Sequence, residues 1–561
     1  MTDRLFIIAD FNAEAFARYL ANTALPDVDI RTAPFGQVHQ SLTGPAPGAE
    51  WSALVWTRPD GVIDAFRRAA EFEPVDPALA MEAVDRFAGT VARFANECRY
   101  VFVPTWTRPS WSRGYGMLDF QPGTGLSYLL SRMNQTLADA LSAERNVFVL
   151  DASRWMAAVG PRATSAKLWY ASKSPFAQAV YEQAAADLAA AFAGLAGRSR
   201  RLVILDLDNI LWGGEVGEVG WPAVTLGGHD HVGEAFVDFQ RALKALTRRG
   251  VQLAIASRND ESVALDMLDR HPEMQLRRED FAAWRINWSD KARSVVELLT
   301  ELNLGAESAV FIDDSAVERA RIADAVPGVL TPDWPEDPAR FVETLLGLAC
   351  FDTPSVTAED RARRAMYADE RTRRQALTAA DDLDSWLQSL DIVVTVEPLG
   401  PANLLRAGQL LNKTNQMNLT TRRASPEELE EWAAQSDNLL LTFRVADRFG
   451  DSGLTGLVGL SFSNDTAQMT DFLLSCRVLG RRVEETLLSA AVAQCRARGA
   501  SRLVLDFIET ARNGPCHEFL RRSGLQQTGA NRFVWDLAQP YATPQPVTLV
   551  DHAGILSGVS R

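Results

Sequence analysis

The chain has 561 residues and a formal net charge of −15 at pH 7, with ordinary shares of apolar and charged side chains. Its length predicts about three to four domains of roughly 150 residues each. The acidic balance argues against a nucleic-acid partner, because binding to phosphate backbones requires a basic field.

Two further features limit the class of protein. No run approaches the ~20 apolar residues of a membrane span, and the first apolar run breaks at Asp10, so we expect neither a membrane protein nor a signal peptide. The cysteines are odd in number and form no Cys-x-x-Cys pair, which predicts neither a disulfide framework nor a zinc site: Cys98, Cys350, Cys476, Cys495 and Cys516. We therefore expect a protein of the reducing cytoplasm.

Residues 1–197 alternate short apolar runs with amphipathic segments, a pattern that predicts a parallel α/β sheet. The predicted strands are LFIIAD, SALVWT, YVFVPTW and NVFVLDA. Polar residues follow these strands and either line a cleft at the carboxyl edge of the sheet or serve as helix caps and loop residues: Asp10, Asn12, Thr57, Arg58, Thr105, Trp106 and Asp151. This layout resembles hydrolases of the SGNH type. No Gly-Asp-Ser block follows the first strand, however, so we expect a binding or docking domain.

The central stretch begins at Arg201 with an apolar run that ends at two carboxylates, Asp206 and Asp208. Such a run predicts a buried parallel strand, and open α/β sheets bind ligands at the carboxyl ends of these strands. Residues two apart in a strand point to the same face, so the two carboxylates would require a cation or a shared proton. Mg²⁺ suits this role, because it takes oxygen ligands and binds through carboxylates and substrate phosphates.

Residues 198–350 repeat the order of strand and helix, and two more predicted strands end in polar residues. Ser257 and Asn259 follow one strand, and Asp313 and Asp314 follow another. Lys291 begins a predicted helix between them, so all these groups would converge on one edge of the sheet. A carboxylate nucleophile, a hydroxyl, a lysine and a second acidic pair are the groups that phosphoryl transfer requires.

The ordered blocks resemble the haloacid dehalogenase (HAD) superfamily of phosphotransferases. A closer resemblance is to the FkbH-like proteins of polyketide pathways, carried by DLDNILWGGEVGEVG, AIASRND, EDFAAWRINWSDKA and FIDDSAVERA, and further along by LLNKTNQMNLTTRR and SCRVLGRRVEE. This resemblance implies a glyceryl transferase and phosphatase of polyketide or antibiotic biosynthesis. Such an enzyme would take a glyceryl unit from 1,3-bisphosphoglycerate, remove its phosphate and load it on the thiol of an acyl carrier protein.

The resemblance also implies roles for single residues. Asp206 would be the nucleophile that forms an aspartyl phosphate, and Asp208 would be the general acid and base. Ser257, Asn259 and Lys291 would bind the substrate through its phosphoryl oxygens. The expected cofactor is Mg²⁺, with these ligands: Asp206, Asp208, Asp313 and Asp314.

Several neighbouring residues leave alternatives open. Ile210 stands where the family usually has Thr and cannot donate a hydroxyl hydrogen bond, which puts the phosphatase rate in question. Arg258 stands where Lys is common. Trp212 either walls the pocket or packs in a tight turn. His229 and His231 resemble a metal pair, but adjacent loop histidines without a third ligand are more typical of exposed side chains.

The remaining sequence predicts a linker, a third domain and a tail. Residues 351–390 are charged and predict a solvated helical linker. Residues 391–538 follow the order of a GNAT-type acyltransferase, in which a strand leads into a helix whose N-terminal amides bind a pyrophosphate. Residues 539–561 predict a loose extension. The predicted fold class is α/β: a HAD-type, Rossmann-like parallel sheet at the centre, flanked by an SGNH-like α/β domain and a GNAT-like α+β domain.

The third domain supplies candidates for acyl transfer. Arg477 and Gly480 match the pyrophosphate loop of GNAT proteins, but Arg482 takes its last small position, so a phosphopantetheine arm on a carrier protein fits as well as free coenzyme A. Cys476 is either a thiolate nucleophile, activated by flanking arginines, or a buried core residue. Asn412 and Lys413 are candidates for binding the glyceryl hydroxyls or phosphate.

The sequence thus favours a loading enzyme with a phosphatase site and an acyl-transfer site. The alternative is a stand-alone HAD phosphatase of another small phosphorylated metabolite, with the flanking domains serving recognition. A third possibility is a carrier-docking scaffold whose phosphatase site has decayed, which the complete acidic set argues against. Covalent modification of a carrier protein separates the first function from the other two.

Overall fold

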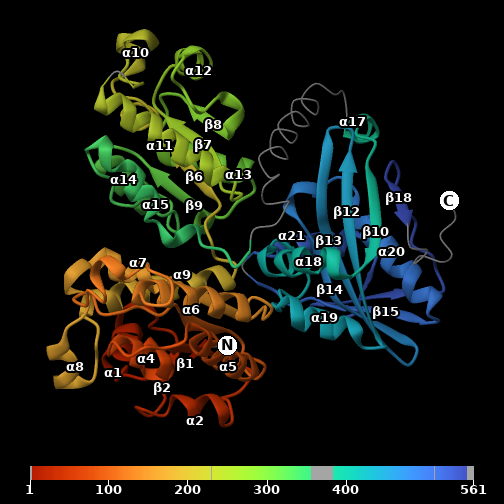
Figure 1. The fold of residues 1–561 in the computed structure, drawn as a ribbon. Coiled ribbons are helices and arrows are strands. Elements are labelled where there is room, and N and C mark those ends of the chain that lie inside the picture. Colours follow the sequence, from red (N-terminus) through yellow and green to blue (C-terminus); the bar gives the residue numbers. More distant parts are fainter. Residues whose placement is uncertain (1–2, 229, 356–382, 511, 552–561) are drawn as a thin grey trace. The chain divides into compact units, whose positions relative to one another are not determined.

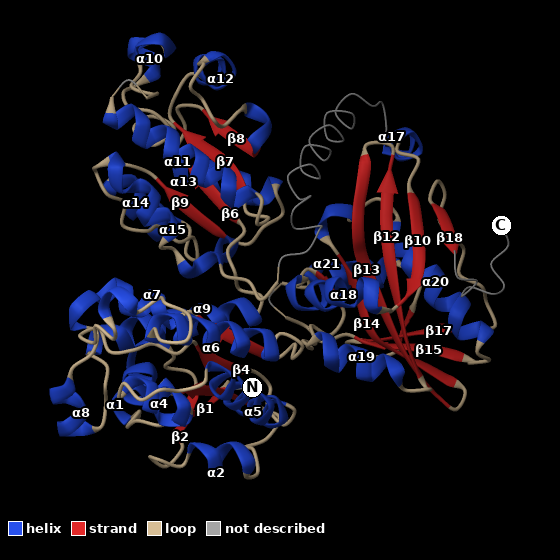
Figure 2. Cartoon of the chain, viewed as in Figure 1, coloured by secondary structure: helices blue, strands red, loops and turns tan. Residues whose placement is uncertain are grey.

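The computed structural model describes residues 3–228, 230–355, 383–510 and 512–551, and the side chains of residues 383, 384 and 476 lie outside the description (Figure 1). The chain divides into two compact units, residues 1–192 and residues 193–561. The first unit holds one sheet and the second holds two, and each sheet has its own apolar core (Figure 2). The predicted mixed α/β class with parallel sheets is confirmed.

The first unit is built on a five-stranded sheet of order β2-β1-β3-β4-β5, in which all neighbours are parallel. Its strands are β1 (Arg4–Ala9), β2 (Asp29–Thr32), β3 (Trp51–Trp56), β4 (Val101–Pro104) and β5 (Val147–Leu150). Four of them are the apolar runs expected from the sequence. The short, polar edge strand β2 was not predicted, because DIRT carries no apolar periodicity.

Nine α-helices accompany these strands among the residues that the structure describes, and the last three of them follow β5. They are α1 (Glu14–Tyr19), α2 (Val38–Thr43), α3 (Pro59–Val62), α4 (Asp64–Ala70), α5 (Pro77–Ala95), α6 (Leu126–Leu141), α7 (Ala152–Val159), α8 (Ala166–Ser172) and α9 (Gln178–Leu195). The longer ones bury apolar stripes against the sheet, as α5 does with Val84 and Val91.

The polar residues at the carboxyl edge of this first sheet are bonded within the domain. The Asp10 carboxylate accepts hydrogen bonds from the backbone N–H and the Nε of Arg58 at 2.9 and 3.0 Å. Thr57 accepts a hydrogen bond from the Trp106 indole, and Asp151 caps α7. Of the two interpretations of these residues, the structure therefore favours caps and loop contacts.

The second sheet has the order β8-β7-β6-β9, with all neighbours parallel. Its strands are β6 (Leu202–Leu205), β7 (Gln252–Ser257), β8 (Phe281–Ile286) and β9 (Ala309–Ile312). Strands β6, β7 and β9 are buried along their whole length, which explains their mainly apolar sequences. The partly exposed edge strand β8 was not predicted as a strand.

Six α-helices accompany this second sheet in the described chain. They are α10 (Val216–Val219), α11 (His231–Thr247), α12 (Glu261–Arg270), α13 (Lys291–Glu301), α14 (Ala316–Ala325) and α15 (Phe341–Leu346). Asp230, Asp260, Asp290 and Ser315 cap the helices that follow them through side-chain bonds to backbone N–H groups. These caps fix the start of each helix directly after the loops at the carboxyl edge of the sheet.

The third sheet is mainly antiparallel, with the order β16-β17-β15-β14-β13-β12-β10-β18 and β11 paired to β14. Its strands are β10 (Val393–Pro398), β11 (Met417–Asn418), β12 (Asn438–Asp447), β13 (Gly450–Ser463), β14 (Thr466–Leu474), β15 (Arg502–Asp506), β16 (Gln526–Gln527), β17 (Arg532–Asp536) and β18 (Thr548–Asp551). The central pair β14 and β15 is parallel, because the long helix α20 (Val483–Ala497) connects them. The other helices are α17 (Leu383–Ser389), α18 (Pro401–Lys413), α19 (Pro426–Ala434) and α21 (Gly514–Arg522).

Two boundaries differ from the sequence prediction. The expected loose tail contains β18, which pairs in parallel with β10, and Val547 just before it is buried in the domain core. The expected linker contributes Trp386 and Leu387 of α17 to the same core, and its residues 356–382 lie outside the described chain. In the part of the chain that is described, we find no helix with the length and apolar character needed to cross a membrane.

Candidate functional site

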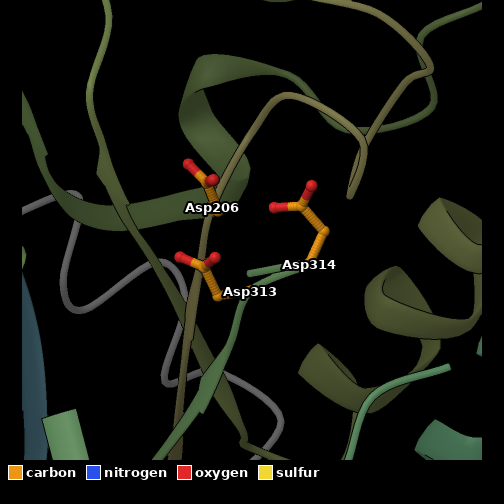
Figure 3. A group of neighbouring side chains, drawn as sticks. All are labelled: Asp206, Asp313 and Asp314. Carbon is orange, nitrogen blue, oxygen red and sulfur yellow. The ribbon is translucent and has the colours of Figure 1, made fainter. Parts of the chain in front are cut away.

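Three carboxylates gather at the carboxyl edge of the second sheet. Asp206, Asp313 and Asp314 each place one oxygen within 4.8 Å of the others. The strand register explains this arrangement, because Leu205 at the end of β6 is paired with Ile312 at the end of β9. Figure 3 shows the side chains of Asp206, Asp313 and Asp314 as close neighbours. Asp206 and Asp313 are buried and Asp314 is exposed.

Lys291 balances part of this negative charge. Its Nζ lies 2.8 Å from Oδ2 of Asp206 and 2.6 Å from Oδ2 of Asp313, and the ammonium group is buried. Burial alone lowers the pKa of Lys291, but the two carboxylates outweigh it and raise this pKa, so the lysine is a cation. Burial, followed by the nearby charge of Asp206, raises the pKa of Asp313 to about 6.

The remaining oxygens fit a small hard cation. Oδ1 of Asp206 is buried and has no hydrogen-bond partner among the described residues. An unpaired buried carboxylate oxygen is costly unless a cation or a donor satisfies it. With three oxygen donors and one lysine, the site carries excess negative charge and has the ligand type that Mg²⁺ prefers. Asp206, Asp313 and Asp314 are therefore the residues that would hold Mg²⁺.

The Asp208 carboxylate does not belong to this group of three. Its Oδ1 accepts hydrogen bonds from the Trp212 indole at 2.8 Å and from the Val216 backbone N–H at 3.0 Å. Its Oδ2 accepts a hydrogen bond from the Asn259 amide at 2.9 Å. Burial raises the pKa of Asp208, which favours the protonated form that a general acid needs. The side chain predicted as a metal ligand is thus held by three donors of the chain instead.

The residues predicted to bind phosphate take two different places. Ser257 ends β7 and is buried at the same edge as the carboxylates. The side-chain amide of Asn259 donates a hydrogen bond to Asp208, and its side-chain oxygen accepts one from the N–H of Asp260. Asn259 therefore orients Asp208, and its contact with a phosphoryl oxygen stays a prediction.

The two departures from the family pattern have local explanations. Ile210 is fully buried in the apolar core beside the second sheet, where a hydroxyl would have no advantage. Arg258 forms an ion pair of 2.8 Å with Glu318 of α14. Trp212 is fully buried in the apolar core, which favours the packed turn of its two alternatives, and its indole N–H donates to Asp208. His231 is exposed at the start of α11, and His229 lies outside the described residues.

Only some of the residues predicted to bind substrate in the third domain lie together. Lys413 and Arg477 line one hollow, together with Gln416 and Ser475. Asn412 exchanges two hydrogen bonds with the backbone of Ala424, and its role in substrate binding stays a prediction.

The loop before α20 has its own geometry. Cys476 begins a short turn over Cys476–Val478, and its side chain lies outside the described residues. Gly480 has a φ of 73°, and its N–H donates to the carboxylate of Glu484 at 2.7 Å. Sequence reasoning missed Glu484, although an acidic residue in the first turn of a helix is a recognisable capping signal.

Comparison with known proteins finds solved structures that are similar to parts of this chain. No protein-family model and no curated protein match the chain. The N-terminal part of BF1531 from Bacteroides fragilis, which contains a phosphatase domain and was crystallised in complex with Mg, is similar at 24% identity and a TM-score of 0.57. The match covers 63% of this chain and 94% of that chain, and it shows a shared fold.

Two solved acetyltransferases assigned to the GNAT family are also similar over a smaller part. The protein from Desulfovibrio desulfuricans shares 14% identity at a TM-score of 0.21, and the protein from Staphylococcus aureus shares 10% at 0.20. Each match covers 26% of this chain and 99% of the other.

Proposed function

We propose that this chain is a Mg²⁺-dependent phosphatase coupled to an acyl transferase. It takes a glyceryl unit from 1,3-bisphosphoglycerate, removes its 3-phosphate and loads the unit on the phosphopantetheine thiol of an acyl carrier protein, in polyketide or related biosynthesis. The observation that supports the phosphatase best is the buried set of Asp206, Asp313 and Lys291 beside a separately held Asp208. The choice of glyceryl donor and carrier protein rests on the sequence resemblance.

In the phosphatase step, one carboxyl group is the nucleophile and another transfers the proton. An oxygen of Asp206 attacks phosphorus and forms an aspartyl phosphate, while the bond from phosphorus to the glyceryl oxygen breaks. Asp208 gives its proton to that leaving oxygen and then takes a proton from the water that hydrolyses the aspartyl phosphate. Lys291 stabilises the charge on the transferred group. Bound Mg²⁺ would add neutralisation of phosphate charge.

The acyl transfer is assigned to the third domain. In the proposed step the Cys476 thiolate attacks the acyl carbon of the donor, and the carbon–oxygen bond to the 1-phosphate breaks with release of phosphate. The carrier thiol then attacks the resulting thioester, and Cys476 leaves as thiolate. The support for this role is the sequence, which places Cys476 directly before an arginine-rich loop and a helix N-terminus.

The intact mass of a phosphopantetheinylated carrier protein tests both steps together. The carrier is incubated with this chain, Mg²⁺ and a system that generates 1,3-bisphosphoglycerate. A glyceryl increment is expected with the wild-type chain, a phosphoglyceryl increment with Asp206→Asn, and no increment with Cys476→Ala. An unmodified carrier together with released phosphate would instead support a stand-alone phosphatase of another small phosphorylated metabolite.

A further inference from the structure

The N-terminus of α20 holds a carboxylate that belongs to the chain itself. Glu484 lies in the first turn of this helix, and only 8% of the residue is exposed. Its Oε1 accepts the Gly480 N–H at 2.7 Å, so an amide of the loop is already occupied. A helix N-terminus attracts anions through its free amides and its dipole, and here the anion is supplied internally.

The arginines of the same loop are engaged with protein groups. The Arg481 guanidinium is buried and lies 3.3 Å from the carboxylate of Asp447, and it also donates to the carbonyl of Arg477. Arg482 donates to the carbonyl of Gln545. A pyrophosphate at this helix end would therefore meet the buried carboxylate of Glu484, while the nearby cations already have acidic or carbonyl partners. Like charges at short range without water between them are strongly unfavourable.

The second oxygen of Glu484 indicates what this helix end accepts. Oε2 is buried and has no hydrogen-bond partner among the described residues. A buried acceptor without a donor is costly, and a ligand that brings an N–H or O–H group would satisfy it. Neutral amide and hydroxyl groups suit the position, whereas phosphate oxygens offer only further acceptors.

We propose that Glu484 selects a thiol arm whose amide or hydroxyl donors lie at the N-terminus of α20, and that it excludes the pyrophosphate of free coenzyme A. The inference rests on the proposed acyl transfer and names its thiol substrate as a pantetheine arm that approaches without pyrophosphate. Glu484 acts here as a specificity-determining residue. Selectivity arises from a repulsive element against the competitor as well as from a hydrogen bond to the substrate.

Calorimetric titration of the full chain with pantetheine and with coenzyme A tests this assignment. The wild-type chain should bind pantetheine at least about tenfold more tightly than coenzyme A. Glu484→Gln keeps an acceptor for Gly480 but loses the charge, so the preference should fall by about tenfold. Glu485→Gln removes the same charge one residue further along the helix, away from the Gly480 contact, and should keep the preference.

Three results would overturn the inference: equal affinities in the wild-type chain, an unchanged preference in Glu484→Gln, or no binding of pantetheine. If Glu484→Gln fails to fold, inorganic pyrophosphate decides, because it must not displace pantetheine from the wild-type chain. Hydrogen exchange of the β14 and β15 amides, which flank α20 in the chain, reports whether the third domain of each variant is folded. Carrier loading is measured in parallel, so a chain that shows the pantetheine preference but loads no carrier would contradict the proposed function and leave this selectivity standing.

Discussion

At the scale of single residues, the phosphatase site separates its two acidic roles by their hydrogen-bond partners. Among the described residues, Asp206 keeps a buried oxygen without a hydrogen-bond partner, whereas Asp208 is held at both oxygens by donors of the chain. The first arrangement suits a nucleophile beside a cation. The second suits a proton carrier whose position must be fixed, because proton transfer requires the heavy atoms to stay within hydrogen-bond reach.

Trp212→Phe tests whether catalysis depends on the fixed position of the Asp208 carboxyl group. The variant keeps the buried ring but loses the indole donor to Asp208, so kcat for phosphate release should fall about tenfold while KM changes little. Steady-state kinetics with a small phosphate ester measure both constants. The matched control is Trp284→Phe on edge strand β8, which loses an indole bond to Glu261 of α12. Equal losses in the two variants, or an effect confined to KM, would contradict the positioning role.

The first unit contains a carboxyl group whose titration should affect stability. Burial is the main cause that raises the pKa of Asp10 to about 6, against about 3.9 in an unfolded chain. The folded unit therefore holds this proton more strongly than the unfolded chain, and the resulting stability is lost as pH rises from about 4 through 6.

Asp10→Asn should remove this pH dependence. Between pH 3 and pH 7 the stability of the variant relative to the wild-type chain should rise by up to about 3 kcal/mol. Hydrogen exchange of β1 and β3 amides, corrected for intrinsic rates, measures the difference. Asp29→Asn on edge strand β2 is the control. A relative stability that stays constant with pH would show that Asp10 ionises normally.

At the scale of elements, β18 adds a last strand to the third sheet and so covers the edge of β10. It pairs in parallel with β10 over Val393–Val396, and Val547 anchors its start in the core. Proline-rich flanking sequence hid this strand from prediction, since four residues without alternation carry little signal. Pairing at an edge also protects β10 from contacts with other chains.

Val547→Ala should therefore destabilise the third domain by about 2 kcal/mol, because a buried side chain loses its apolar contacts. Hydrogen exchange of the β10 and β12 amides reports the loss within this domain. Thr548→Ala changes a neighbouring exposed side chain and should have a much smaller effect. Equal protection in both variants would mean that the segment is the loose extension that composition alone predicts.

At the scale of the whole molecule, the sequence predicts best the strands and site residues that follow from a local pattern of apolar and polar residues. Apolar runs ending in carboxylates predicted β6 and β9, and parallel pairing then brought Asp206 and Asp313 together. The hydrogen bond from Asn259 to Asp208 could not be predicted, because the two residues lie 51 positions apart and the amide could equally have faced a substrate. The bond from Asn412 to the backbone of Ala424 could not be predicted for the same reason, since polarity alone does not reveal a partner.

Separate cores for the sheets also determine how far the effect of a bound metal extends. Mg²⁺ binds only the folded site, so saturating it at about 100 times its Kd should stabilise the second sheet by about 2.7 kcal/mol. Because Asp206 and Asp313 follow β6 and β9, slower exchange should appear in these strands and in β7, and not in β1 or β3. Asp314→Asn should weaken the response, and Asp324→Asn, on α14 away from the cluster, should preserve it. Equal protection of all sheets would show that the ion acts elsewhere on the chain.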